Sequence, residues 1–391
     1  MKVFICVNNY TQIQGINSVV DQFFFNRELF KQKGIDIAGV YDCKRVYYDR
    51  PLRTLSNNKG INSIFHTLKG TFLYKTYIGQ IIAVIIRMIL PAFNCYKNSK
   101  TSNADVFLTQ DVFVSYFLLK KSKKVKLIFM THMYERQNAN LLMNYPKLKG
   151  TFFERYLEKI NQYVFLNSDA IVTICKNANN KLVQDFGLKK VYTVYNTIKN
   201  TVSEQALPGT HDKVRFVSAS HLTFVKGIDM LCTVLKEICK TTESKDCEFH
   251  LYGDGEYYKE LVKLKRDEGL ENLFLYGNVQ TPYKNYTDKD VYISTSRMET
   301  LPMGILEAMS VGLPILSTSV GAIPELICDE NGLLVKPEVE DIKCGILKMI
   351  GLKKHLQVMG VNSKFFFETN CSRAVWVDKF TLIFNEVINK V

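Results

Sequence analysis

The sequence predicts an α/β protein with two domains, each built around a parallel β-sheet. Short apolar runs rich in β-branched residues alternate with helical patterns along the whole chain, which is typical of parallel sheets. A polar stretch at residues 196–213, which contains Pro208 and Gly209, interrupts this alternation and is the expected linker. The length of 391 residues is enough for two separate hydrophobic cores.

The elements follow the same order in both halves. The first half opens with an expected strand at residues 2–7 and a helix from about Gly15 to Lys33, which Gly34 ends. The other strands expected in this half are residues 36–41, 105–110, 126–132, 170–175 and 191–196. The strands expected in the second half are residues 214–220, 248–255, 273–279, 290–296, 314–319 and 332–337. Ligands of such sheets bind beside the carboxyl ends of the strands.

The composition and the cysteine pattern indicate the class of protein. A hydrophobic content of 47% and a charged content of 23% are those of a soluble globular protein. The ten cysteines contain no C-x-x-C pair, which argues against a zinc site or a secreted disulfide framework. The N-terminal "MKVFICVNN" has too short an apolar run for a signal peptide. We therefore expect a reduced, cytoplasmic protein.

The most apolar stretch runs from Tyr77 to Phe93 and is broken by Gln80 and Arg87. No segment reaches the uninterrupted apolar length of about 18 to 20 residues that a spanning helix needs. We interpret the stretch as a buried helix. The alternative is a helix that dips into a membrane surface, with the Arg87 side chain reaching back to the head groups.

Charge is divided unevenly between the halves. Residues 1–200 hold 29 Lys and Arg against 12 Asp and Glu, a net charge of +17, whereas residues 201–391 hold 22 against 26, a net charge of −4. The excess in the first half predicts an anionic partner, such as lipid head groups or a diphosphate. The lysine run at residues 120–126 is interpreted as a solvated helix end. Since no zinc-finger, RNP or basic-zipper signature is present, we do not expect nucleic acid binding.

The stretch "SRMETLPMGILEAMSVGLP", residues 296–314, keeps two carboxylates among apolar residues. Pro302 suits the first turn of a helix, and Gly312 suits its end. Glu299 would then lie in a loop facing the helix N-terminus, and Glu307 about one and a half turns into the helix. Free N–H groups at a helix N-terminus favour a phosphate. Two carboxylates beside a phosphate suit the hydroxyls at the two ends of a nucleotide sugar.

Other polar residues follow expected strands. Lys226 precedes a glycine and a helix, where it could neutralise a diphosphate, although a surface lysine explains it equally well. His132 ends a strand of the first half, and Gly15 opens the first long helix. Gly15 lies in no complete G-x-G-x-x-G motif, so a dinucleotide site is poorly supported. The loops at Gly253 and Gly277 could admit a base or a ribose.

These motifs resemble those of the retaining glycosyltransferases of family 4. The match is most specific over residues 296–337, where an E-x7-E motif is followed by "NGLLVKP", and it includes "KGIDML" and "YGDG". The resemblance implies a GT-B fold, with two Rossmann-like parallel-sheet domains facing across a cleft. It also implies an acceptor-binding domain of residues 1–198, a donor-binding domain of residues 199–372, and a final helix of about 373–391 that crosses back to the first domain.

The resemblance also implies roles for single residues. Glu299 would contact hydroxyls of the donor sugar, Lys226 the diphosphate, and Glu307 the ribose hydroxyls. Backbone N–H groups that would face the sugar and phosphate belong to Leu301, Met303 and Gly304. The candidate catalytic residues are therefore Glu299 and Lys226, together with His132, which would lie near the transferred sugar.

The remaining donor-binding positions come from four loops. The loops that hold Gly253, Asn278 and Val279 would frame the base, and Gly15 would lie by the phosphate or the acceptor. Two positions depart from the family pattern. His221 stands where an arginine usually pairs with the lysine on the diphosphate, and Gln14 replaces the first glycine of the usual Gly-Gly. Loss of a permanent cation at residue 221 should weaken stabilisation of the leaving diphosphate.

We therefore expect a transferase that moves a hexose-type sugar, with retention, from a nucleotide diphosphate sugar to a glycan or lipid-linked saccharide. The donor is expected to be a UDP-sugar, the pathway bacterial cell-surface polysaccharide synthesis, and no metal or other cofactor is expected. The enzyme would be cytoplasmic, with a possible peripheral contact to the anionic inner face of the membrane. The alternatives are a nucleotide-sugar epimerase or hydrolase of the same fold, and a non-catalytic nucleotide- or glycan-binding module.

Overall fold

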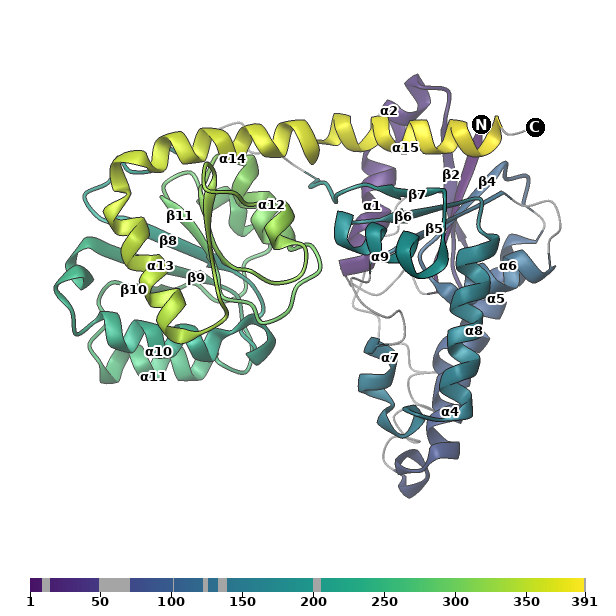
Figure 1. Ribbon diagram of the computed structural model, residues 1–391, viewed down its shortest axis with the longest axis horizontal. Coiled ribbons are helices and arrows are strands. Elements are labelled where there is room, and N and C mark those ends of the chain that lie inside the picture. Colours follow the sequence, from purple (N-terminus) through teal and green to yellow (C-terminus); the bar gives the residue numbers. More distant parts are fainter. Residues whose placement is uncertain are drawn as a thin grey trace. The chain divides into compact units, whose positions relative to one another are not determined.

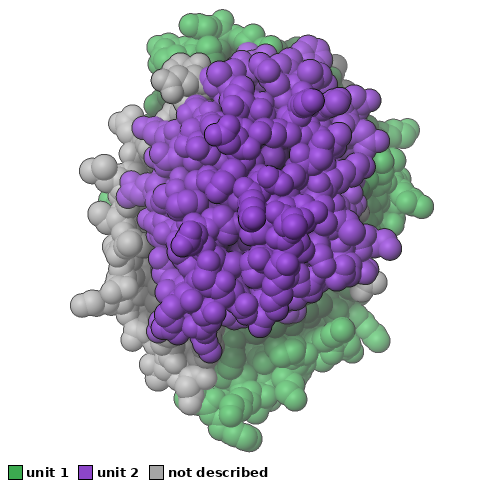
Figure 2. All heavy atoms as spheres, turned by 90° about the vertical axis from the view of Figure 1, so that its left-hand side faces the viewer, with its two compact units in different colours: residues 1–194, 377–391 green, residues 195–376 purple. Residues whose placement is uncertain are grey.

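The computed structural model describes residues 1–8, 15–48, 71–100, 102–121, 126–132, 139–199 and 205–389. The chain forms two compact units, which Figure 1 and Figure 2 show. Unit 1 comprises residues 1–194 and 377–391, and unit 2 comprises residues 195–376. The predicted boundaries, at residues 198/199 and 372/373, lie a few residues from these two divisions.

Unit 1 is built on a seven-stranded sheet with the order β3-β2-β1-β4-β5-β6-β7. All neighbouring strands are parallel except β3, which runs antiparallel to β2. The strands are β1 (Lys2–Cys6), β2 (Asp36–Tyr41), β3 (Val46–Tyr47), β4 (Val106–Thr109), β5 (Lys126–Thr131), β6 (Ala170–Thr173) and β7 (Val191–Thr193). The six strands predicted for this half are confirmed. The two-residue edge strand β3 was missed, because it is too short to show a period.

The α-helices of unit 1 that lie between its strands surround this sheet, except that α4 and α7 lie in a projection beyond one end of it (Figure 1). They are α1 (Gly15–Phe25), α2 (Arg27–Gln32), α4 (Tyr77–Val84), α5 (Leu90–Ser99), α6 (Val112–Lys121), α7 (Ala139–Asn144), α8 (Phe152–Asn167) and α9 (Lys176–Phe186). The single helix predicted from Gly15 to Lys33 is two helices, broken at Asn26. The Asn26 amide donates to the Gln22 carbonyl at 2.8 Å, a local bond that competes with helix continuation.

The apolar stretch from Tyr77 forms a longer helix than expected. A π-helical segment, η2 (Ile85–Ile89), joins α4 to α5, so that a continuous helix runs from Tyr77 to Ser99. It has 23 residues and contains an 18-residue window with a mean hydropathy of 1.8, so by length and composition it could cross a membrane. One face of it belongs to the core of unit 1, through Ala83, Val84, Ala92 and Cys95. The predicted burial of this stretch is therefore confirmed for one face.

The last helix, α15 (Arg373–Ile388), starts in unit 2 and ends in unit 1. Its Phe380 ring lies 4.8 Å from the Phe23 ring, edge to face, and its Phe384 ring lies 6.2 Å from Phe30. All four aromatic side chains are fully buried. A 2.7 Å ion pair between Lys33 and Asp378 also joins α15 to unit 1. The predicted return of the last helix to the first domain is thus confirmed.

Unit 2 contains a six-stranded, fully parallel sheet with the order β10-β9-β8-β11-β12-β13. Its strands are β8 (Val214–Ala219), β9 (Cys247–Tyr252), β10 (Leu273–Leu275), β11 (Val291–Ser294), β12 (Ile315–Thr318) and β13 (Gly332–Val335). Its helices are α10 (Ile228–Ile238), α11 (Tyr258–Asp267), α12 (Met303–Ser310), α13 (Val339–Gly351) and α14 (Leu356–Asn370). All six predicted strands are confirmed. β8 lies between β9 and β11 in the sheet, so the first residues of these three parallel strands are neighbours.

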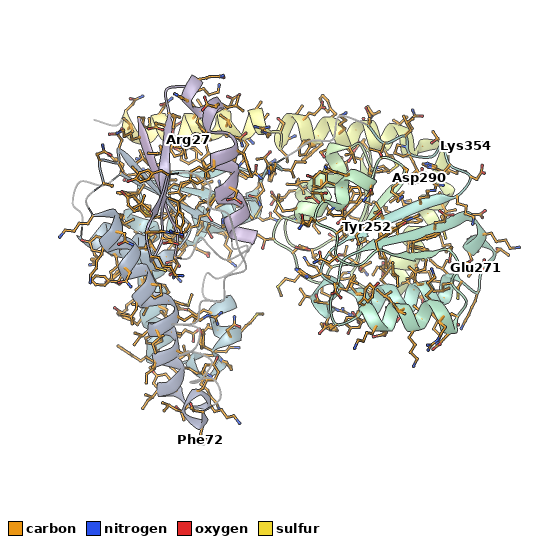
Figure 3. All side chains as sticks on the ribbon, turned by 180° about the vertical axis from the view of Figure 1, so that it is seen from behind. Arg27, Phe72, Tyr252, Glu271, Asp290 and Lys354 are labelled. Atoms are coloured by element: carbon orange, nitrogen blue, oxygen red, sulfur yellow. The ribbon has the colours of Figure 1, made fainter. Side chains whose placement is uncertain are left out.

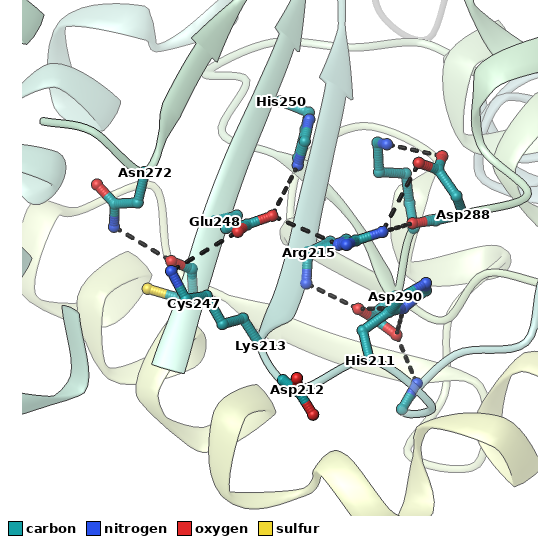
Figure 4. Close-up of polar contacts among 12 residues, drawn as sticks. His211, Asp212, Lys213, Arg215, Cys247, Glu248, His250, Asn272, Asp288 and Asp290 are labelled. Atoms are coloured by element: carbon teal, nitrogen blue, oxygen red, sulfur yellow. Dashed lines mark hydrogen bonds and ion pairs between the residues drawn. The ribbon is translucent and has the colours of Figure 1, made fainter. Parts of the chain in front are cut away.

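The second part of the predicted linker belongs to unit 2 and is held by a polar network (Figure 4). The buried Asp290 carboxylate accepts hydrogen bonds from the Gly209 N–H at 2.5 Å and the Arg215 N–H at 2.8 Å. The His211 ring lies 3.0 Å from the same carboxylate. These contacts anchor the second part of the predicted linker in unit 2, where its polar groups satisfy a buried acid. Residues 200–204 lie outside the described residues.

Candidate active site

The loops that follow β8, β9, β10 and β11 meet at the carboxyl edge of the second sheet. The Leu222 N–H donates to the Asp254 carbonyl at 3.0 Å, which joins the first two loops. The Gly253 N–H donates to the Gly277 carbonyl at 2.7 Å, which joins the second and third. Because these backbone hydrogen bonds join neighbouring loops, each loop is restrained by the next. The edge is therefore a pre-formed surface, of the kind that binds ligands in α/β sheets.

Lys226 and Glu299 come together in this surface. The Lys226 ammonium forms a short ion pair with Glu299 Oε1, and the Ser296 hydroxyl donates to the same oxygen at 3.1 Å. The two side chains are 28% and 12% exposed, so the pair is partly shielded from water. Two residues that are 73 positions apart in sequence thus form one charged centre. The sequence predicted both residues for the donor site but not their direct contact.

The lysine loop is locked against the loop after β11. Gly227, which follows Lys226, has a φ of +68°, and an added Cβ would lie 1.9 Å from the Thr295 carbonyl oxygen. The Thr295 hydroxyl donates to the Lys226 carbonyl at 3.0 Å. A residue larger than glycine would both strain the backbone and push the loops apart. The Lys-Gly order seen in the sequence is therefore a requirement of packing as well as of charge.

A second ion pair, which the sequence analysis missed, joins the same loops. The Arg297 guanidinium makes two hydrogen bonds to the Asp229 carboxylate, of 2.5 and 2.6 Å, and donates to the Phe224 carbonyl at 2.8 Å. Its central carbon lies 3.9 Å from the centre of the Phe224 ring. The hydrogen bonds from Arg297 lower the pKa of Asp229. The signal was available, since both residues lie inside motifs that the sequence analysis used, "SRMET" and "KGIDML".

The N-terminus of α12 opens next to Glu299. Pro302 has an extended backbone and precedes the helix, so it is the N-cap residue and does not belong to the first turn as predicted. Met303 and Gly304 are the first two helical residues, and their N–H groups have no acceptor within the helix. A Cβ added to Gly304 would lie 2.2 Å from the Tyr292 hydroxyl, so a larger residue would require the Tyr292 side chain to shift. Leu301 is buried and fixes the approach to the helix.

Glu307 lies one turn further along α12, in an apolar environment. Burial raises the pKa of its carboxyl to about 7. The charge of Glu307 is close enough to raise the pKa values of Tyr286 and Tyr292, which burial already raises. The Tyr286 hydroxyl is buried and has no hydrogen-bond partner among the described residues. A half-buried acid and an unpaired buried hydroxyl are groups that a polar ligand could satisfy.

Four further predicted positions lie on the same edge. His221 is exposed in the loop after β8, and Asn278 and Val279 occupy the loop after β10. Gly253 directly follows β9. The structure thus gathers the donor-site residues predicted in unit 2 on the loops after four neighbouring strands and on α12. Their roles in binding stay predictions.

Gly15 and His132 belong to unit 1. Gly15 is the first residue of α1, and His132 directly follows β5. Burial lowers the pKa of His132 to about 4, and its ring Nε2 is buried with no partner among the described residues. A neutral imidazole with an unsatisfied nitrogen can accept or donate one hydrogen bond to a ligand. Its assignment as a catalytic residue stays a prediction.

Comparison with known proteins indicates the class of enzyme. The model of the family "Glycosyl transferases group 1" matches residues 201–365, which contain every candidate residue of unit 2. The O-antigen biosynthesis glycosyltransferase WbnH of Escherichia coli is 26% identical over 290 residues, which are 72% of this chain and 79% of WbnH. The uncharacterized glycosyltransferase MJ1178 of Methanocaldococcus jannaschii is 29% identical over 256 residues, which are 64% of this chain and 65% of MJ1178.

Solved structures show the same architecture. The apo form of the lipopolysaccharide outer core galactosyltransferase WaaB aligns over 99% of both chains, with a TM-score of 0.68 and 16% identity. Anabaena Alr3699/HepE in complex with UDP aligns over 99% of this chain and all of its own, with a TM-score of 0.65 and 14% identity. The protein described here is thus a glycosyltransferase with the GT-B fold, and its residues 201–365 match the group 1 glycosyltransferase family.

Proposed function

We propose that this enzyme is a retaining glycosyltransferase of family 4 that uses a UDP-sugar. It would transfer a hexose-type sugar to a glycan or lipid-linked saccharide in the synthesis of a bacterial cell-surface polysaccharide. The observation that carries this proposal is the contact of Lys226 with Glu299 beside the N-terminus of α12. This arrangement supplies one cation and free N–H groups for a diphosphate, and one carboxylate for sugar hydroxyls.

The proposed reaction depends mainly on stabilisation of the leaving diphosphate. In the proposed reaction the bond between the anomeric carbon and the diphosphate oxygen breaks, and the acceptor oxygen bonds to the same face of that carbon. The acceptor proton passes to the departing diphosphate, so no side-chain base is required. Lys226 and the N–H groups of Met303 and Gly304 would stabilise the charge that develops on the diphosphate. Transfer without a metal follows from this proposal, and turnover in excess EDTA checks it.

The relatives support the substrate class. The name of WbnH places that protein in O-antigen biosynthesis. A Staphylococcus aureus relative, 24% identical over 201 residues, is named a poly(ribitol-phosphate) alpha-N-acetylglucosaminyltransferase. The first name gives O-antigen synthesis and the second gives transfer of N-acetylglucosamine, and Alr3699/HepE was solved with UDP. We therefore propose a cytoplasmic enzyme that meets its acceptor at the inner face of the membrane.

Release of UDP from UDP-sugars, with and without an acceptor saccharide, tests the proposal. Lys226→Ala should lower turnover about a hundredfold or more, because it removes the side-chain cation from the diphosphate site. Lys343→Ala is the matched control: Lys343 is 25% exposed and forms a 2.7 Å ion pair with Glu237, on helices α13 and α10. Full activity of Lys226→Ala would refute the proposed site. UDP release that is independent of acceptor would indicate a hydrolase, and binding without release would indicate a binding module.

A further inference from the structure

Unit 1 carries a cluster of exposed apolar side chains at the end of α4 farthest from its sheet. Phe72 is 83% exposed, Ile78 63%, Met143 67% and Phe152 79%. Leu73 is also exposed, at 43%. We call these five residues the apolar tip. Large apolar side chains that gather on a surface indicate a site of contact with a partner or a membrane.

The apolar tip is one surface, although its residues come from two separate parts of the chain. The 3₁₀ segment η1 (Phe72–Lys75) packs on α4, and α4 packs on η3 (Pro146–Leu148), which lies just before α8. The Lys147 N–H donates to the buried Gln80 side chain at 2.9 Å. The rings of Tyr74 and Tyr145 lie 6.3 Å apart. Figure 3 labels Phe72 at the end of the projection that α4 and α8 form.

The apolar tip is surrounded by basic side chains. Residues 71–78 and 143–159 contain two acidic residues, Glu154 and Glu158, and a larger set of exposed basic residues, which are Lys75, Lys147, Lys149, Arg155 and Lys159. Glu154 accepts a hydrogen bond from the Gly150 N–H, which engages part of its charge locally. Apolar side chains with a basic border match the boundary between the head groups and the acyl chains of an anionic bilayer.

We propose that the apolar tip inserts into the head-group region of an anionic membrane, with the surrounding lysines on the lipid phosphates. This rests on the membrane-linked acceptor proposed above and names the surface that makes the contact. The proposed contact is made by Phe72 in η1 and Phe152 in α8. It differs from the alternative that the sequence left open, in which the flank of the helix near Arg87 dips into the membrane. The long Lys side chains can lie along apolar surface while their ammonium groups reach the phosphates.

Co-sedimentation of the full chain with vesicles tests the proposal. The protein should bind vesicles that contain phosphatidylglycerol, bind pure phosphatidylcholine weakly, and dissociate at high salt. Phe72→Ser with Phe152→Ser should reduce binding at least about tenfold, since the inserted apolar area supplies much of the affinity. Lys75→Gln, Lys147→Gln and Lys149→Gln together should reduce binding to anionic vesicles only. Phe365→Ser in α14 is the matched control, because Phe365 is 65% exposed but lies in unit 2.

Three outcomes would overturn the proposal. They are indifference of the wild type to anionic lipid, equal binding by the Phe72/Phe152 variant, and a concentration-dependent dimer that the same variant abolishes without vesicles. The last would make the apolar tip a contact between copies of the chain. The tip variants should keep wild-type UDP release with a water-soluble acceptor, whereas Lys226→Ala should lose it and still bind vesicles. Failure of the membrane contact and failure of the proposed activity are thus distinguished.

Discussion

At the scale of single residues, opposite charges are paired at the candidate active site of unit 2. Lys226 and Glu299 neutralise each other, and the half-buried Glu307 holds a proton more readily than an exposed acid. A bound diphosphate would bring negative charge beside Lys226, whose ammonium group would then interact with both Glu299 and the diphosphate. The ion pair thus compensates the charge of the partly shielded Lys226 ammonium group when no donor is bound.

Glu307 predicts a pH dependence of donor binding. Only the ionised carboxyl accepts hydrogen bonds from two ribose hydroxyls with both oxygens, and burial raises the pKa of Glu307 to about 7. UDP-sugar affinity should therefore rise between about pH 6 and about pH 8, and Glu307→Gln should bind weakly with little pH dependence. Titration calorimetry with a UDP-sugar, whose diphosphate does not titrate in this range, measures both effects. An unchanged pH profile in Glu307→Gln would exclude this role.

The same pKa predicts the sign of a stability effect. Because the pKa of Glu307 is raised from 4.5 to about 7 in the folded protein, the folded state binds more protons between these values. The contribution of Glu307 to the free energy of unfolding should therefore fall as pH rises through this window and stay constant above it. Urea unfolding of the wild type and Glu307→Gln at several pH values isolates this contribution, which the variant should lack.

His221 permits a gain-of-function prediction. It is exposed in the loop after β8, five residues before Lys226, and it stands where the resemblance implies an arginine. An arginine is permanently charged and can bind two phosphate oxygens at once. His221→Arg should therefore tighten UDP or raise kcat, by about three- to tenfold for a gain of about 1 kcal/mol. A UDP affinity and kcat equal to those of the wild type would mean that a different cation already serves the diphosphate.

At the scale of elements, loop geometry depends on the pair of Arg297 and Asp229. This pair ties the loop after β11 to the start of α10, and Lys226 lies between the segments that it joins. Its two side chains are each 28% exposed, so we expect it to contribute less than about 1 kcal/mol to global stability. Its larger effect should be on the position of Lys226.

We therefore predict that Arg297→Lys and Asp229→Asn each lower kcat by about ten- to a hundredfold, because small displacements of catalytic groups are costly. The thermal midpoint should change little. The double variant should be no worse than either single variant, since both remove the same interaction. Arg266→Lys, in the exposed pair with Asp267, is the control. Additive losses in the double variant would show that the two residues act separately.

At the scale of the whole molecule, the last helix ties the end of the chain to unit 1. Phe384 is fully buried, whereas Leu382 on the same helix is 63% exposed. Phe384→Ala should lower the free energy of unfolding by about 3 to 5 kcal/mol, and Leu382→Ala should change it by less than about 0.5 kcal/mol. Urea unfolding followed by the fluorescence of Trp376, the single tryptophan, measures this in α15 itself. Equal effects of the two variants would mean that α15 is not packed as described.

Much of the architecture was predictable. Twelve strands were predicted, six in each sheet, because they are three to six residues long, rich in apolar residues and bounded by polar or glycine positions. The exceptions have local causes. β3 has two residues, and Asn26 breaks a helix through a side-chain bond that a periodic pattern does not reveal. Residues 200–204 of the predicted linker and the lysines at 123 and 124 lie outside the described residues.

The sequence by itself determined the alternation of strands and helices and which residue types stand at the strand ends, because these depend on local periodicity and short-range spacing. The return of the last helix to the first domain was implied by the resemblance to the family 4 glycosyltransferases. The tertiary structure alone decided the contacts of Lys226 with Glu299 and Arg297 with Asp229, and the burial that raises the pKa of Glu307. The physical reason is that sheet order brings distant loops together. Burial and charge then act between residues that lie far apart in the chain.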